Sequence, residues 1–179
     1  TKDEFYQKLI NNNKKPTFGT PAITLVSKDD NKSLFSLGGI SNRYTIHCNE
    51  NGYWSTYNSD RYGFNNPDSE WDKKSIDFLL IGDSLVHGSC VDPEYNIAGV
   101  IRKISNGNSV LNLANRGAGA LIEYAFLREY LKYIQPKKVI WFFSEPNDKN
   151  DLLDAMLLIS LTNKGPKNQF PTFGCSIKW

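Results

Sequence analysis

The fold is decided by the stretch Ile76-Asp77-Phe78-Leu79-Leu80-Ile81-Gly82-Asp83-Ser84. A short apolar run that ends at a glycine is typical of a buried strand in a parallel sheet. The glycine permits a tight turn, and residues 93–105 predict a helix with Pro93 near its first turn. A strand, a turn and a helix in this order are the beginning of a βαβ unit.

The same order of elements returns twice. Residues 109–113 predict a second strand, and the loop 114–119 then opens a helix. Residues 138–143 predict a third strand, which Pro136 separates from the preceding helix, and residues 151–161 predict another helix. This alternation predicts an α/β fold with a central parallel sheet and helices on its faces.

The helix after the second strand has a marked apolar stripe. Its members recur at spacings of three and four and are Tyr124, Leu127, Leu131 and Ile134. Charged Glu123, Arg128 and Lys132 are expected to lie mainly off this stripe. The stripe should therefore pack on the sheet while the charged side chains face solvent.

Residues 1–75 lack this alternation and are predicted to form an irregular cap. They contain a short helix candidate at 3–10, turn formers at 11–16 and two short strand candidates at 44–47 and 53–57. The Asn51-Gly52 pair between the two strand candidates favours a hairpin-like turn. The sequence thus predicts a cap over 1–75 and an α/β core over 76–179.

Charge and hydropathy narrow the range of partners. The chain has 179 residues and a net charge of +2, and no block of like charges stands out. Composition therefore gives no electrostatic reason to expect nucleic acid or an anionic membrane as a partner. The longest apolar run, 155–161, is far shorter than the roughly 20 residues that span a bilayer. A neutral small molecule or a glycan is the expected ligand.

The cysteines give no sign of a framework. Cys48, Cys90 and Cys175 are an odd number at long spacings, which predicts neither a disulfide framework nor a zinc cluster. His47 beside Cys48 lacks the spacing of metal ligands, and no second pair exists. No metal centre is expected.

Polar residues follow each of the three predicted strands. In an open parallel sheet, ligands bind outside the carboxyl ends of the strands, so these loops can share one cleft. Ser84, at a strand-to-helix turn, presents its hydroxyl as a nucleophile does. The backbone N–H groups of Ser84 and Gly117, with the side-chain amide of Asn147, have the chemistry that an oxyanion hole needs.

At these residues the chain resembles the SGNH (GDSL-like) hydrolase family. The matching segments are Gly82-Asp83-Ser84, 112–119 and Pro146-Asn147-Asp148, in the family's order. The resemblance implies a three-layer α/β/α fold, Ser84 as nucleophile, and Gly117 and Asn147 in the oxyanion hole, without a metal or organic cofactor. Residues 59–67 also resemble a segment that precedes the core in some bacterial members, including relatives of polysaccharide O-acetyl-modifying proteins.

Two features depart from the family pattern. Glu145 stands where the third block usually has glycine, and the Asp-x-x-His block that supplies the catalytic base is missing. The chain has only His47 and His87. His87, at the start of the helix that carries Ser84, would not approach the hydroxyl from the side that a triad histidine uses. We therefore expect both histidines to be structural and the core to be incomplete at its C-terminus.

The functional prediction follows from these residues. The chain is expected to be a serine ester hydrolase or O-acyltransferase that works through an acyl-enzyme on an O-acylated carbohydrate or a small ester. The alternative, favoured by the missing histidine, is a catalytically inactive SGNH-like binding module or a truncated fragment.

Overall fold

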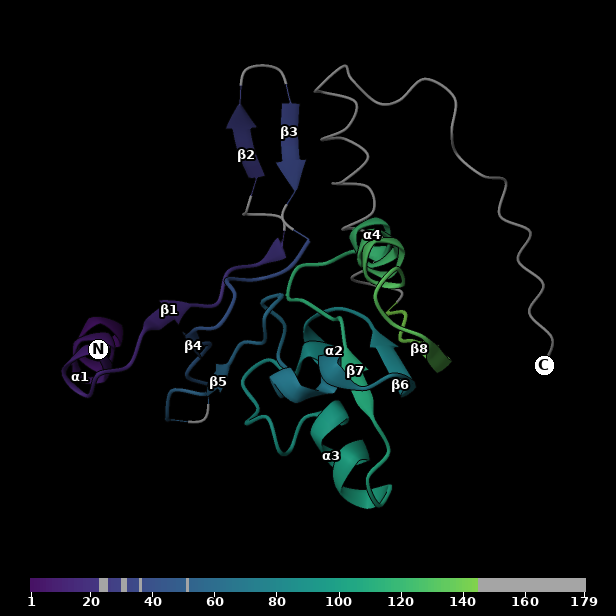
Figure 1. Ribbon diagram of the computed structural model, residues 1–179. Helices are drawn as coiled ribbons and strands as arrows, with labels where there is room; N and C mark the ends of the chain where they lie inside the picture. The colour runs from purple at the N-terminus through teal and green to yellow at the C-terminus, as the bar shows by residue number, and fades with distance from the viewer. Residues whose placement is uncertain (23–25, 30–31, 36, 51, 145–179) are drawn as a thin grey trace.

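The computed structural model describes residues 1–22, 26–29, 32–35, 37–50 and 52–144. At its centre lies a parallel sheet of β6 (Ile76–Ile81), β7 (Val110–Asn112) and β8 (Pro136–Trp141), in the order β7-β6-β8 (Figure 1). Leu80 of β6 pairs with Asn112 on one side and with Ile140 on the other. The carboxyl ends of all three strands therefore meet at one edge, and the α/β class is confirmed.

The strand bounds follow the prediction closely, with one shift. The first strand is confirmed over its whole length, and the second is one residue shorter at each end. The third begins at Pro136 and ends at Trp141, two residues earlier than predicted at each end. Pro136 pairs with Ile76 as the first residue of β8, a place where a missing N–H is tolerated.

Two helices cover the sheet from opposite sides, α3 (Ile97–Ile104) and α4 (Ala120–Tyr130) (Figure 1). Phe78 and Leu80 pack in the cluster that contains α3, whereas Leu79 and Ile81 pack in the cluster that contains α4. This alternation is the two-residue period of a strand that is buried on both faces. Crossover connections between parallel strands are right-handed. The connection from β6 to β7 runs in one direction across the sheet, and the connection from β7 to β8 runs in the other. The two connections must therefore lie on opposite faces of the sheet.

The helix predicted over 93–105 begins later, at Ile97. Asn96 caps it, since its side-chain Oδ1 accepts a hydrogen bond from the Gly99 N–H at 2.7 Å. A separate short helix, α2 (Ser84–His87), directly follows the first strand, and Gly88 ends it with a left-handed φ of 82°. The local capping residues, rather than Pro93, set these bounds.

The predicted apolar stripe is confirmed only in part, since Leu127 packs against the core cluster and Ile134 is buried in it. Helix α4 buries Ile122, Phe126 and Tyr130, whereas Leu131 is 41 % exposed. Glu123, expected off the stripe, is fully buried and accepts a hydrogen bond from Trp141 Nε1 at 2.6 Å. A partner on β8 thus lets a carboxylate occupy a position that the sequence pattern assigns to solvent.

The cap region contains more regular structure than predicted. After α1 (Lys2–Asn11) come the strands β1 (Pro16–Phe18), β2 (Val26–Asp29), β3 (Lys32–Phe35), β4 (Tyr44–Ile46) and β5 (Thr56–Asn58). The predicted antiparallel pairing of β4 with β5 is confirmed, and β1 adds to β4 in parallel. β2 and β3 form a separate hairpin, which the sequence analysis missed and which projects away from the central sheet (Figure 1). Within the described residues, every helix is too short or too polar to cross a membrane.

The segment that leads from β5 to the short 3-10 helix η2 (Asp68–Asp72) joins the cap to the core. Phe64 is buried in the same apolar cluster as α4, and Trp71 packs against it. The Asp60 carboxylate is fully buried and accepts four hydrogen bonds of 2.8–2.9 Å, from Tyr62 N, Phe64 N, Asn66 Nδ2 and Trp71 Nε1. The Asn66 side chain in turn bonds both the N–H and the C=O of Asn112 on β7.

We expect Asp60→Asn to lower the free energy of unfolding by about 3 kcal/mol. The amide replaces one carboxylate oxygen with an NH2 group, so buried N–H donors that bonded this oxygen lose their acceptor. Chemical denaturation measures this change. Asp68→Asn is the matched control, since Asp68 pairs with Arg61 at the surface and such pairs contribute about 1 kcal/mol or less. Equal losses in the two variants would show that the Asp60 hydrogen bonds do not hold this segment.

Candidate functional site

The strand order places a topological switch point at the carboxyl edge of the parallel sheet. The chain leaves β6 toward the face covered by α3, and it leaves β7 toward the face covered by α4. The loops after two neighbouring strands therefore separate, which makes a topological switch point. The predicted site residues Ser84 and Gly117 lie on these two loops.

Ser84 is the first residue of α2, three positions after the end of β6. Asp83 caps this helix, since its Oδ1 accepts a hydrogen bond from the Leu85 N–H at 2.9 Å. Gly82 is required at the turn, because a Cβ there would lie 2.5 Å from Cγ2 of Val86. The turn leaves Ser84 partly exposed, as a nucleophile must be.

Gly117 adopts a left-handed φ of 69°, in the loop after β7. A Cβ on it would lie 3.0 Å from Cβ of Pro21, and the neighbouring Arg116 C=O accepts a hydrogen bond from Ala22 N at 2.9 Å. Among the described residues, the N–H groups of Ser84 and Gly117 donate to no partner. Two of the three predicted oxyanion donors are thus on neighbouring loops, and the third, Asn147, lies outside the described residues together with Glu145, Asp148 and the helix predicted over 151–161.

Asn112 connects the two loops, a role that the sequence analysis did not assign. Its Nδ2 donates to the Val86 C=O of α2 at 2.7 Å, and its Oδ1 accepts from the Ala114 N–H at 2.9 Å. The side chain is 1 % exposed, so these bonds are shielded from water. An asparagine at the end of an otherwise apolar strand was the available signal.

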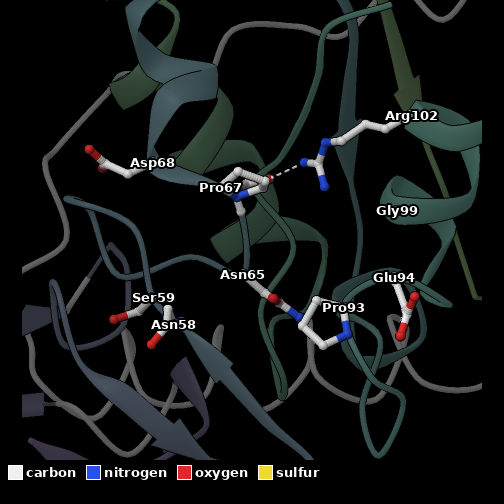
Figure 2. A pocket seen from close by; sticks show the side chains of 10 residues that line it. Asn58, Ser59, Asn65, Pro67, Asp68, Pro93, Glu94, Gly99 and Arg102 are labelled. Atoms are coloured by element: carbon white, nitrogen blue, oxygen red, sulfur yellow. Dashed lines mark hydrogen bonds between the residues drawn. The ribbon is translucent and has the colours of Figure 1, made fainter. Parts of the chain in front are cut away.

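A cavity of about 560 Å³ lies elsewhere, between the segment after β5 and the start of α3 (Figure 2). Most of its polar lining consists of amides, carboxylates and one guanidinium, from Asn58, Asn65, Asn66, Asp68, Glu94 and Arg102. Neither Ser84 nor Gly117 lines it.

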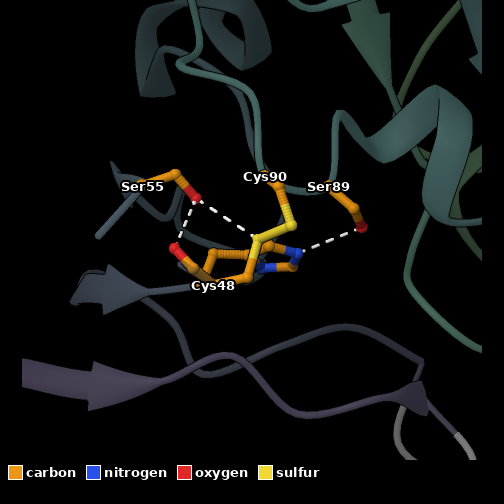
Figure 3. Close-up of a disulfide and its surroundings, with 5 residues drawn as sticks. Cys48, Ser55, Ser89 and Cys90 are labelled. Carbon is orange, nitrogen blue, oxygen red and sulfur yellow. Dashed lines mark hydrogen bonds between the residues drawn. A yellow bond between two sulfur atoms is a disulfide. The ribbon is translucent and has the colours of Figure 1, made fainter. Parts of the chain in front are cut away.

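A disulfide joins Cys48, just after β4, to Cys90, just after α2 (Figure 3). The prediction that the cysteines form no disulfide is therefore wrong. The two residues are 42 positions apart, and the packing of the cap on the core brings their Cα atoms to 5.2 Å. The bond fixes the cap next to the helix that carries Ser84.

The two histidines stack on each other beside the disulfide. Their ring centroids are 4.8 Å apart, and His47 Nε2 lies 3.0 Å from Ser89 Oγ. Burial, together with the charge of Arg116, lowers the pKa of His47 to about 4. Burial, together with the charges of His47 and Arg116, lowers the pKa of His87 to about 3. Within the described residues, neither ring bonds the Ser84 hydroxyl.

These features define an α/β protein with a serine and two backbone donors at the switch point of a parallel sheet. Comparison of the chain with protein-family models, curated proteins and solved structures gave no match.

The neutral histidine pair should make the protein sensitive to acid. Both pKa values are below the ordinary value of 6.5, so unfolded chains take up protons below that pH while the folded rings stay neutral. Stability should be complete above pH 6.5 and fall by about 1.4 kcal/mol per pH unit for each ring as the pH drops toward 4. Denaturation at pH 7 and pH 5 measures the fall. His87→Phe keeps a stacked ring and should lose about half of the pH dependence, and an unchanged dependence would contradict this assignment.

Removal of the disulfide should lower the free energy of unfolding by about 4 kcal/mol, as expected for a closed loop of this length. The measurement is denaturation of the double variant Cys48→Ser, Cys90→Ser. Cys175→Ser, which removes the cysteine outside the bond, serves as the control and should change little. If reductant leaves the stability of the unaltered protein unchanged, the bond does not constrain the chain.

Proposed function

We propose that the chain carries the nucleophile of a serine ester hydrolase or O-acyltransferase of the SGNH type, with Ser84 as nucleophile. One observation carries the proposal: Ser84 and Gly117 flank the switch point of the sheet, and their N–H groups donate to no described residue. N–H donors without an acceptor, beside the hydroxyl of a partly exposed serine, are what acyl transfer requires.

The reaction then proceeds in two steps. The Ser84 hydroxyl loses its proton to a base and its oxygen attacks the acyl carbon of the ester, while the Ser84 and Gly117 N–H groups stabilise the tetrahedral oxyanion. Departure of the alcohol leaves the acyl group on Ser84. Water or a sugar hydroxyl then takes the acyl group, which decides between hydrolysis and transfer. Asn147 remains the third donor that the sequence predicts.

The base of this reaction is assigned to neither histidine. Both rings are buried in a stack, and burial keeps their pKa values far below neutrality. The family resemblance implies a histidine in an Asp-x-x-His segment, which residues 1–179 do not contain. The same observation favours the second candidate, a binding module that retains the crevice without the base.

The substrate class is proposed from a second sequence resemblance and from the disulfide. An O-acylated carbohydrate is proposed because residues 59–67 resemble a segment of proteins that modify polysaccharides. The Cys48–Cys90 disulfide supports action in an oxidising compartment outside the cytosol. A polysaccharide outside the cytosol is a substrate that fits this location.

A chemical-rescue experiment tests the proposal. With a nucleophile and two donors but no base, the purified chain should hydrolyse 4-nitrophenyl acetate weakly, and added imidazole should raise the rate by supplying the base. Ser84→Ala should remove this gain and leave only the reaction of imidazole itself. Ser89→Ala is the matched control. This serine also lies close to α2, but its hydroxyl is hydrogen-bonded to His47.

Two outcomes would overturn the assignment. An equal imidazole effect in the unaltered chain and in Ser84→Ala would remove Ser84 as nucleophile. Fast hydrolysis without imidazole, insensitive to replacement of either histidine, would show that another group of the chain acts as base. Labelling by a fluorophosphonate, followed by peptide mapping, gives an independent readout of Ser84.

A further inference from the structure

Several polar side chains line the cavity beside α3, and the buried ones are held in place by hydrogen bonds. Asn65 and Asn66 are each 4 % exposed and line it from the segment after β5, and Asn58 lies at the end of β5. Asn65 Nδ2 donates to the His87 C=O, which fixes its side chain. A volume of about 560 Å³ falls within the range of small-molecule pockets.

Arg102 supplies a donor whose position is fixed. Its Nε and Nη2 donate to the Val110 C=O at 3.1 and 2.6 Å, and Nη2 also donates to Asn66 Oδ1 at 2.8 Å. Its other terminal nitrogen, Nη1, makes no hydrogen bond with a described residue. In Figure 2 this nitrogen is directed into the space between the labelled residues. The hydrogen bonds of Nε and Nη2 fix the position of the guanidinium, so Nη1 can donate to an acceptor on a ligand without a further loss of side-chain freedom.

The charges around the cavity disfavour an anion. Arg102 lies 3.9 Å from the buried Glu70 carboxylate, which offsets its charge. Asp68 is paired with Arg61, and Glu94 adds a further negative charge to the lining. A neutral ligand with many hydroxyl groups fits, because each hydroxyl can accept from a guanidinium or amide and donate to a carboxylate.

We propose that this cavity binds a neutral sugar unit. This binding site is separate from the proposed esterase site, since none of the residues that line the cavity belongs to the loops that carry Ser84 and Gly117. Arg102 and the asparagines supply donors, and Glu94 accepts from a sugar hydroxyl at the exposed rim. The proposal needs no acyl group on the ligand.

The test is direct binding to the purified chain. Saturation-transfer NMR and titration calorimetry are carried out with the methyl glycosides of glucose, galactose, mannose and N-acetylglucosamine, and with glucuronate and inorganic phosphate as anionic probes. At least one neutral glycoside should bind saturably at millimolar concentration, more tightly than either anion. Because no ester is present, failure of the esterase proposal leaves this result unaffected.

Rim variants locate the binding site. Asn58→Ala and Glu94→Gln should each weaken binding by about tenfold, the cost of one hydrogen bond to the ligand. Glu50→Gln, an exposed carboxylate outside the lining, should leave binding unchanged. Arg102 is left intact because it also holds β7. Absence of saturable binding, tighter binding of glucuronate or phosphate, or equal affinity in the rim variants and the control would each overturn the proposal.

Discussion

The buried Asp60 carboxylate is the interaction on which the rest of the structure depends. Its four hydrogen bonds fold the segment after β5 into a compact loop and fix the Asn66 amide. Asn66 then bonds both backbone groups of Asn112 at the end of β7, and Asn112 bonds the Val86 C=O of α2. The turn that presents Ser84 is thus connected to the cap by a continuous series of buried hydrogen bonds.

Burial of so many polar groups is stable only because they are paired. A buried carboxylate without hydrogen-bond donors would lose its hydration without any compensating interaction. Asp60 instead exchanges water for two backbone and two side-chain N–H groups. Glu70 follows the same rule, since it accepts from the Val110 N–H and pairs with Lys73. These bonds have fixed directions, so they define the position of the cap on the sheet more narrowly than apolar contacts can.

The proposed esterase site and the proposed sugar cavity are connected through the same network of buried hydrogen bonds. Asn112 holds α2 beneath the Ser84 turn, while Asn66, one bond away, lines the cavity and anchors Arg102. The histidine stack and the disulfide add a second connection between cap and core. A ligand in the cavity would therefore contact residues that also order the loop of the proposed nucleophile.

The sequence by itself determined the elements whose signal is local. The apolar run over β6 and the glycine at its end act over a few residues, so this strand was predictable to the residue. β4 and β5 were predictable as a pair, although β5 begins three residues later than the sequence pattern indicates. The same holds for Gly117, whose left-handed φ of 69° suits the residue type. Only the tertiary structure decided the Cys48–Cys90 bond, the burial of Glu123 against Trp141 and the central place of Asp60. Each of these depends on a partner that is remote in sequence or on another element, and the position of such a partner is set by packing, which no local pattern contains.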